Sequence, residues 1–417
     1  MSEAVDLLDP DVYARTGYPW QAWAELRRHD PVSRRRHGEM GEYWAVVRHA
    51  ELIAVSRRPS EFVSGVRLNM PPRRVHPGQT EEILPETIIT MDPPRHARYR
   101  ALTSRHFTPR ALSAFEPRIA ALAREIVGRA VHQFGDGSEF DFVDEVAARL
   151  PLAVIMELLG VPRADWDALL ALANQTVGSG DPEYNQGGVS ISVALAARKA
   201  IFQHYSAYVA ERRACPRDDL MSALVAARID GRALSDDEIL GYCFLLTAAG
   251  NETTRNATTG GMLALLEHPA ELARLQSDSN LFLRAADEIV RWVSPVIHFC
   301  RTATADTELG GRRIRAGETL VLFYPSAARD ETAFTRADVF DVGRSPNPHV
   351  SFGIGEHYCL GARLARLELA AILRELVAHV GSLELAAPVE RLRSTVIGGI
   401  KHMRVRMTPA RAERAGQ

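Results

Sequence analysis

The stretch from Leu234 to His268 is the feature that most limits how this chain can fold. Apolar residues recur there at three- and four-residue spacing, which is the period of an α-helix. At 1.5 Å per residue the stretch would form a rod of about 50 Å, long enough to cross a whole domain. Its centre, AAGNETT at 248–254, is small and polar where a buried helix is normally most apolar. Such a local exception inside a regular element is typical of a functional site.

The remaining periodicity predicts a mainly α-helical protein with small β-sheets. Helical spacing also runs through 113–133, 143–160, 191–213, 282–292 and 361–380, and short alternating stretches at 43–47, 312–323 and 402–407 indicate strands. No repeat, low-complexity linker or composition break divides the chain, so we expect a single compact domain over residues 1–417, with an N-terminal extension at 1–19 and a flexible tail at 409–417. Two regions rich in proline and glycine, 71–94 and 178–188, are predicted to be functional loops.

The charge balance excludes several classes of partner. With 50 Lys and Arg residues against 52 Asp and Glu residues, nothing suggests binding to nucleic acid or to an anionic membrane surface. The N-terminus lacks the basic start and apolar run of a signal peptide, and NETTRN interrupts the longest apolar stretch, so we expect a soluble, cytoplasmic protein. The four cysteines, Cys215, Cys243, Cys300 and Cys359, are far apart and form no CxxC pair, which argues against a disulfide framework or a tetrathiolate metal site.

Cys359 lies in FGIGEHYCLG at 352–361, directly before a helical stretch. A lone cysteine is most often a small buried apolar residue. Here, however, the three glycines permit tight turns and close approach of the backbone to a flat ligand, and the free N–H groups of a helix start favour a thiolate. Such a thiolate is either a nucleophile with His357 as its base, or the single proximal ligand of a haem iron.

FGIGEHYCLG resembles the haem-binding loop of the cytochrome P450 monooxygenases, whose pattern is Phe-Gly-x-Gly-x-His/Arg-x-Cys-x-Gly. Every fixed position is matched, by Phe352, Gly353, Gly355, His357, Cys359 and Gly361. The resemblance extends over residues 20–408, with all motifs in family order. It implies the cytochrome P450 fold, with a long distal helix over haem b, and it makes Cys359 the axial thiolate ligand of the iron.

AGNETT at 249–254 resembles the family's oxygen-activation motif, with Glu252 where many members have Asp. The resemblance implies that Ala249 and Gly250 leave room for dioxygen beside the haem. Because the activation of dioxygen consumes protons, Glu252 would supply them and Thr253 would pass them on. The alternative is a threonine pair that bonds back to carbonyls of the preceding turn and has no part in catalysis.

Two further sets of residues match the family. Glu288 and Arg291 in EIVR, with Arg344 in FDVGR, resemble its Glu-Arg-Arg core, whose implied role is to fasten the segment before the cysteine loop. Haem also carries two carboxylates that must be neutralised if they are buried. The resemblance assigns the haem-binding role to His96, Arg100, Arg301 and His357 for these carboxylates, and to Ala249, Gly250, Phe352 and Gly361 for the remainder of the cofactor.

The implied function is a haem-thiolate monooxygenase that inserts one oxygen atom from O2 into a C–H bond of a lipophilic small molecule. Sterols, terpenoids, aliphatic chains and antibiotic intermediates of secondary metabolism are the substrate classes that the resemblance suggests. No flavin or iron–sulfur module is recognisable, so electrons from NAD(P)H are expected through a separate ferredoxin and ferredoxin reductase. Five basic residues offer either a docking surface for that donor or an ordinary solvated face: Arg105, His106, Arg110, Arg363 and Arg366.

By resemblance, the substrate pocket is built from the 66–90 and 172–190 loops, the distal helix, the 293–299 segment and the 397–400 turn. The implied apolar contacts are Leu245, Leu246, Ile297, Phe299, Val396 and Ile397. His298 offers a polar contact or, more simply, lies on the surface. Two alternatives stay open. One is a tailoring oxidase that acts on a substrate bound to an acyl or peptidyl carrier protein, or that couples or desaturates. The other is a haem sensor or electron carrier without turnover, which would have no use for Glu252 and Thr253.

Overall fold

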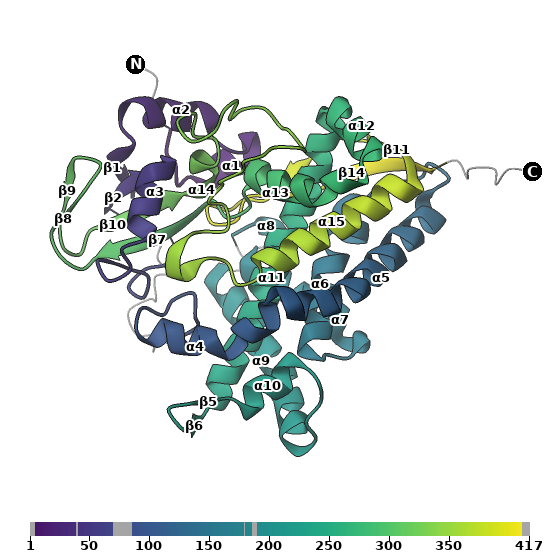
Figure 1. Ribbon diagram of the computed structural model, residues 1–417, viewed down its shortest axis with the longest axis horizontal. Coiled ribbons are helices and arrows are strands. Elements are labelled where there is room, and N and C mark those ends of the chain that lie inside the picture. The colour runs from purple at the N-terminus through teal and green to yellow at the C-terminus, as the bar shows by residue number, and fades with distance from the viewer. Residues whose placement is uncertain (1–4, 39–40, 70–85, 179, 186–189, 411–417) are drawn as a thin grey trace, which may run out of the picture.

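The computed structural model describes residues 5–38, 41–69, 86–178, 180–185 and 190–410. Its helices fill most of the molecule and its largest sheet lies at one side, so the predicted mainly α-helical fold with small sheets is confirmed (Figure 1). The helices are α1 (Pro10–Thr16), α2 (Trp20–His29), α3 (His49–Ser56), α4 (Arg95–Ser104), α5 (Pro109–Phe134), α6 (Arg149–Leu159), α7 (Trp166–Val177), α8 (Pro182–Asn185), α9 (Ser190–Ala214), α10 (Leu220–Ala226), α11 (Asp236–Glu267), α12 (Pro269–Ser277), α13 (Phe282–Val293), α14 (Tyr324–Ala327) and α15 (Ala362–His379).

The long helix predicted from the sequence is α11, which runs through the centre of the molecule (Figure 1). Ser235 begins it with a capping box. The Ser235 hydroxyl accepts the Glu238 N–H at 3.2 Å, and the Glu238 carboxylate accepts the Ser235 N–H at 2.7 Å. The helix packs against α6, α7, α9, α13 and α15. Because neighbours surround it, most of its side chains are buried.

The largest sheet joins strands from both ends of the chain, in the order β1 (Val32–His37), β2 (Gly41–Val46), β10 (Thr319–Phe323), β7 (His298–Ala303) and β3 (Phe62–Val63). Only the β2–β10 pair in this sheet is parallel. A second sheet orders β11 (Val380–Leu385), β14 (Arg404–Pro409) and β4 (Glu139–Asp141). Three two-stranded ribbons complete the described part: β5 (Arg228–Ile229) with β6 (Arg232–Ala233), β8 (Thr307–Leu309) with β9 (Arg312–Ile314), and β12 (Glu390–Arg391) with β13 (Ile400–His402).

The N-terminal segment belongs to the fold, and the expectation of an extension at 1–19 is wrong for the described residues from Val5 onward. Leu7, Leu8 and Tyr13 are almost fully buried and pack in one apolar cluster with Trp23. The hydroxyl of Tyr13 donates to the carbonyl of Leu7 at 2.7 Å. At the other end β14 continues to Pro409, so the expected tail begins later than residue 409, and residues 411–417 lie outside the described part.

Candidate haem-thiolate site

The loop before α15 contains two glycines, Gly353 and Gly355, in backbone conformations that other residues adopt only with strain. Gly353 and Gly355 have φ angles of 71° and 74°, in the left-handed region. A Cβ atom on Gly355 would also lie 2.5 Å from the carbonyl oxygen of Ser56. The N–H of Cys359 donates to the carbonyl of Phe352 at 2.8 Å and closes the loop. The sulfur of Cys359 is therefore presented by a tight turn with a fixed backbone path.

The helix start does not by itself make Cys359 a thiolate. Burial raises the pKa of the Cys359 thiol, although the backbone N–H of Gly361 and the charges of Arg100 and Arg366 act in the opposite direction. The N–H of Gly361 thus favours the thiolate, as expected from the helix start, but desolvation is the larger effect while no metal is bound. A metal ion that coordinates a thiol deprotonates it outright. The loop therefore suits a metal ligand better than a free nucleophile.

Four basic side chains gather beside this loop from three elements. His96 and Arg100 lie on α4, Arg301 on β7 and His357 in the loop, and the two imidazole rings are 4.4 Å apart between centroids. Burial together with the charges of Arg301, His96 and Arg100 lowers the pKa of His357 to about 3. These four predicted cofactor contacts are thus close enough to repel one another.

The cationic cluster lacks a matching anion among the described residues. Glu356 is the one carboxylate in ion-pair range of it, 3.8 Å from Nδ1 of His96, and Nε2 of His96 is buried with no hydrogen-bond partner in that part of the chain. Arg100 donates to the carbonyl of Tyr358 at 2.6 Å and Arg301 to that of Cys300 at 2.7 Å. Neither arginine has a carboxylate partner among the described residues, and removing a charge from water without a counterion is costly. The cluster therefore fits the two carboxylates of haem.

One face of α11 is open in the middle of the helix. Ala249 is exposed although α11 is surrounded, and Leu245 and Thr253, one turn away on either side, are partly exposed. These residues recur every four positions and share a face. A Cβ atom on Gly250 would lie 2.8 Å from the side chain of Ile155 on α6, so close packing of the two helices is a further reason for glycine at this position.

Thr253 and Glu252 point to different surroundings. The Thr253 hydroxyl donates to the carbonyl of Ala249 at 2.8 Å, which is the back-bonded arrangement left open from the sequence. The hydroxyl oxygen of Thr253 can still accept a hydrogen bond. Glu252 is buried, and one of its carboxylate oxygens accepts from Arg255 at 2.6 Å. Burial raises the pKa of Glu252 although Arg255 opposes the shift. An acid with a raised pKa takes up a proton more readily than an exposed carboxylate does.

Arg255 was not identified from the sequence as a residue of the site. Its second terminal nitrogen donates to the side-chain oxygen of Asn174 on α7 at 3.1 Å, so the carboxylate of Glu252 is tied through Arg255 to a neighbouring helix. The i, i+3 spacing of Glu252 and Arg255 was visible in the sequence. The contact with Asn174 was not, because it depends on how α7 and α11 pack.

The predicted Glu-Arg-Arg set is assembled and fully enclosed. Arg291 donates to both carboxylate oxygens of Glu288 at 2.7 Å, and Nε of Arg344 lies 3.0 Å and 3.1 Å from the same two oxygens. The remaining guanidinium nitrogens donate to backbone carbonyls at Ala328, Thr335, Arg336, Ala337 and Val339. These bonds hold the chain that leads to the cysteine loop.

The segments expected to form the substrate wall lie side by side. The N–H of Ile297 donates to the carbonyl of Val396 at 2.8 Å, and Val296 pairs with Ile397 in an isolated bridge. Val396 and Phe299 are partly exposed and remain candidates, as does Leu246, whereas Ile397 is almost fully buried. Ile297 is completely buried in the cluster around Trp23, so it is not an open substrate contact. Residues 70–85 of the 66–90 loop lie outside the described residues, as do 179 and 186–189 of the 172–190 loop, whose described part includes the end of α7 and α8.

His298 is not at the surface, which corrects the simpler of the two expectations. It is fully buried, and burial lowers its pKa to about 4, although a hydrogen bond with the backbone of Thr395 acts against this. The imidazole is therefore neutral. It joins β7 to the segment that carries Val396.

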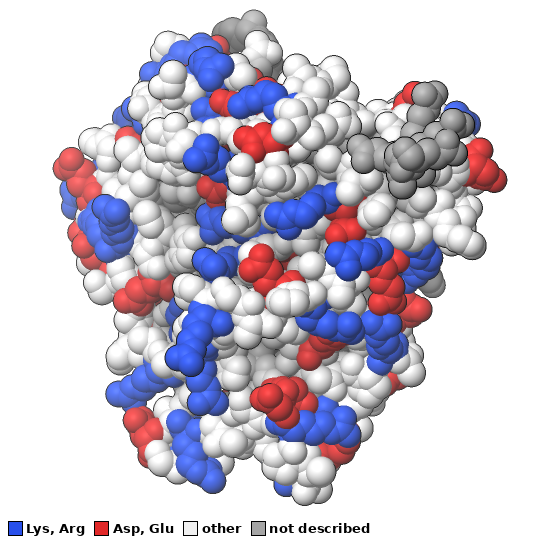
Figure 2. Space-filling view, turned by 45° about the vertical axis from the view of Figure 1, so that its right-hand side comes forward, with Lys and Arg blue, Asp and Glu red and all other residues white. Residues whose placement is uncertain are grey.

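The five expected docking residues differ in solvent exposure and in whether they form ion pairs. Arg105, Arg110 and Arg363 are exposed, and His106 is partly exposed. Arg366 instead donates to Asp287 at 2.6 Å and is only 29% exposed. Figure 2 shows basic side chains running down the left of one face of the molecule, with acidic side chains mixed among them over the rest. A general basic patch is thus not what distinguishes this face.

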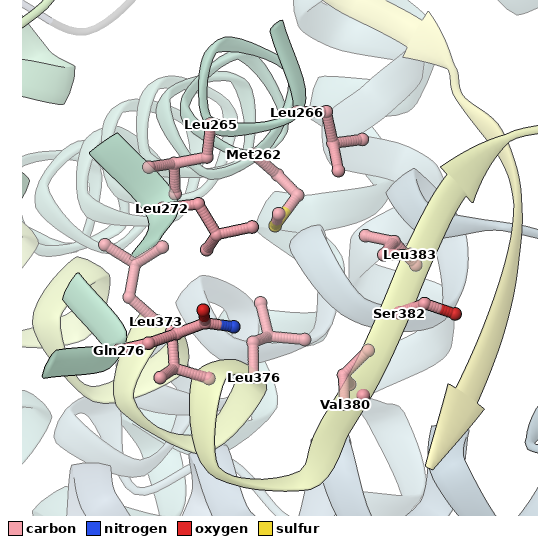
Figure 3. Close-up of a pocket in the computed structure, with 12 residues that line it drawn as sticks. Met262, Leu265, Leu266, Leu272, Gln276, Leu373, Leu376, Val380, Ser382 and Leu383 are labelled. Carbon is pink, nitrogen blue, oxygen red and sulfur yellow. The ribbon is translucent and has the colours of Figure 1, made fainter. Parts of the chain in front are cut away.

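A pocket elsewhere in the molecule is not the reaction site. It measures about 60 Å³ and is lined mostly by aliphatic side chains from α11, α12, α15 and β11, with Gln276 and Ser382 as its polar side chains (Figure 3). Met262 in its wall is twelve residues beyond Gly250, which is about 18 Å along α11. The pocket offers no titratable group.

A cysteine presented by a glycine turn, with a cluster of basic side chains beside it, is the arrangement expected of a haem-thiolate protein. The cytochrome P450 family model matches residues 192–380. A steroid C26-monooxygenase from Rhodococcus jostii is 40% identical over 415 residues, 97% of this chain and 85% of the relative. Cytochrome P450-terp from a Pseudomonas species is 34% identical over 96% of each chain. The chain therefore belongs to the cytochrome P450 family, and it is a monooxygenase whose haem iron takes a cysteine thiolate ligand.

Solved structures agree over the whole chain. A Mycobacterium marinum cytochrome P450 in complex with pseudoionone has a TM-score of 0.88 and 36% identity, with 97% of this chain and 98% of that chain covered. A Bacillus megaterium cytochrome P450 in complex with testosterone has a TM-score of 0.81 and 30% identity, with 95% and 99% covered. Among the described helices, none combines the length and apolarity needed to cross a bilayer.

Proposed function

We propose that this monooxygenase hydroxylates a C–H bond of a lipophilic small molecule of the steroid or terpenoid kind. The observation that carries the proposal is the open face of α11, where Leu245, Ala249 and Thr253 are accessible in the middle of an otherwise enclosed helix. An accessible stripe of apolar and small side chains with one hydroxyl suits a substrate without charge. Pseudoionone and testosterone, the ligands in two solved relatives, are of this kind.

Within the site, Cys359 would hold the haem iron, and His96, Arg100, Arg301 and His357 would neutralise the haem carboxylates. When bound, haem supplies the chemistry that activates dioxygen with two electrons from outside. Glu252 would hold a proton in a dry environment, since burial raises its pKa. Thr253 would accept a hydrogen bond at its hydroxyl oxygen from a water of the relay, while its own hydrogen bond to Ala249 fixes its orientation.

Phe299 and Val396 would form the apolar wall that orients the substrate, with Leu245 and Leu246 on the helix opposite. A ferredoxin and its reductase would deliver electrons from NAD(P)H. Arg105, Arg110 and Arg363 are the exposed basic residues that a small acidic donor would meet.

The test begins with the holoprotein and two probe ligands, testosterone and pseudoionone. We expect either compound to displace water from the iron and shift the haem spectrum to the high-spin form. Turnover with a surrogate ferredoxin and reductase under isotopically labelled dioxygen should then place one labelled oxygen atom in the product. A spectrum that responds to neither compound would refute the substrate class. Product that carries oxygen from water would refute the monooxygenation of that substrate.

A further inference from the structure

Arg366 is held in place near the start of α15, although from the sequence it was expected to belong to a docking surface or to an ordinary solvated face. Nε donates to Oδ1 of Asp287 at 2.6 Å, and a terminal nitrogen donates to the hydroxyl of Tyr358 at 3.3 Å. The guanidinium lies over the ring of Phe352, 4.5 Å from its centroid. Phe352 and Tyr358 both belong to the loop that presents Cys359. The charge of Arg366 is therefore packed against that loop and has one fixed position.

Asp287 on α13 anchors this arrangement through a second partner. Its Oδ1 also lies 3.0 Å from Nε2 of His349, whose side chain is 1% exposed. The N–H of Ser351 donates to Nδ1 of the same ring at 3.3 Å, so Nδ1 is the acceptor and Nε2 carries the proton that Asp287 receives. Burial raises the pKa of Asp287, but hydrogen bonds from His349 and Arg366 and their charges outweigh it, and the pKa lies below its usual range. The anchor therefore stays ionised.

We propose that Arg366, held by Asp287 and His349, is a positioning residue that sets a fixed positive charge beside Cys359 and raises the reduction potential of the haem bound there. This inference rests on the proposed haem-thiolate site. Reduction adds one electron from an external donor to the iron while the thiolate stays bound, so the site becomes one charge more negative. A nearby cation stabilises the reduced state more than the oxidised state. Charges and hydrogen bonds around the ligand sulfur are known levers on haem potential.

Arg363 provides a matched control on the same helix. It lies one turn before Arg366, is exposed, and forms no ion pair with any residue in the described part of the chain. An exposed charge on a flexible side chain is screened by water and salt within about 8 Å at physiological ionic strength, whereas a packed one is screened less. If position and packing matter, the two arginines must differ in their effect on the haem.

The experiment is a spectroelectrochemical titration of the holoprotein and of Arg366→Gln, Arg366→Lys and Arg363→Gln. We expect Arg366→Gln to shift the midpoint potential to more negative values, Arg366→Lys to restore most of the wild-type value, and Arg363→Gln to leave it unchanged. The shift for Arg366→Gln should persist at high salt. An unchanged potential in Arg366→Gln, or a shift no larger than that of Arg363→Gln, would overturn the proposal. An equal shift in Arg366→Gln and Arg366→Lys would also overturn it, because packing and not charge would then be the cause.

The carbon monoxide spectrum of the reduced protein distinguishes a failure of the role of Arg366 from a failure of the proposed haem-thiolate function. If the wild type lacks the red-shifted band of thiolate-bound haem, the proposed function fails. If all variants keep that band and the potentials are equal, only the role of Arg366 fails. Should Arg366→Gln not retain haem, Arg366→Met, which preserves the length of the side chain over Phe352, takes its place with the same expected shift and the same refutation.

Discussion

Replacement of Glu288 by glutamine tests whether the enclosed charge network holds the chain before the cysteine loop. The carboxylate is completely buried and is shared by Arg291 and Arg344, at 2.7 Å to 3.1 Å. Glutamine has nearly the same shape but no charge. It would leave two buried guanidinium groups facing one amide, and the amide nitrogen would be a donor placed against donors.

The expected loss follows from the geometry. Removal of one partner from a buried ion pair costs about 3–5 kcal/mol, because the remaining charge stays desolvated. With an unfolding entropy of about 2.1 cal/mol/K per residue over 417 residues, unfolding entropy is about 0.9 kcal/mol/K, so the melting temperature should fall by about 3–6 °C. We expect Glu288→Gln to lose haem at a lower urea concentration than the wild type, because the loop that carries Cys359 is held less firmly.

The assay is urea unfolding of the holoprotein, followed by the haem absorption and by far-ultraviolet circular dichroism. Glu25→Gln is the matched control, since Glu25 pairs with Arg28 at the same i, i+3 spacing but both side chains are more than half exposed, at 54% and 53%. That control should not differ measurably from the wild type. If Glu288→Gln unfolds at the same midpoint as Glu25→Gln, the buried network does not stabilise the fold, and the reasoning is refuted.

Of three further predictions, two concern the site and the third concerns the ion pairs of His402, which lie elsewhere. Thr253→Ala should retain haem but divert electrons from product to free hydrogen peroxide; equal product per NAD(P)H would rule out its relay role. Cys359→Ser should abolish the red-shifted carbon monoxide band, whose survival would mean a different ligand. Burial would lower the pKa of His402, but hydrogen bonds and charges from Asp141 and Glu183 raise it. His402→Gln should therefore destabilise most below about pH 6.5, with the loss fading as pH rises through the raised pKa; a pH-independent loss in urea titrations would contradict this.

The sequence predicted the elements that depend on local pattern. The period of apolar residues located α11 within two residues of its ends, and the capping box at Ser235 explains where it starts. The spacing in FGIGEHYCLG located the turn that holds Cys359, since Gly353 and Gly355 do adopt left-handed angles. These features are encoded within one or two turns of chain, where sequence distance and spatial distance agree.

What failed depended on contacts between distant segments. Ile297 was expected to be an open substrate contact, yet packing of the N-terminal helices places it in the cluster with Trp23. The burial of His298 has the same origin, because its partner at Thr395 is almost a hundred residues away. The close approach of Ile155 on α6 to Gly250 likewise depends on how two helices pack, and it was not predicted. No local pattern specifies which face of a strand or helix a remote segment will cover.

The two buried charge clusters show how scaffold and site differ in physical terms. Around Glu288 each guanidinium nitrogen finds a carboxylate or a carbonyl within the protein, so the cluster is complete. Beside the cysteine loop, a buried nitrogen of His96 has no partner among the described residues, and burial together with the neighbouring charges keeps His357 neutral. A charge cluster whose groups are all paired adds rigidity, whereas one with unpaired groups is stabilised when an anion binds to it. The carboxylates of haem would supply that anion, so the cofactor's binding would relieve the repulsion that the chain alone must bear.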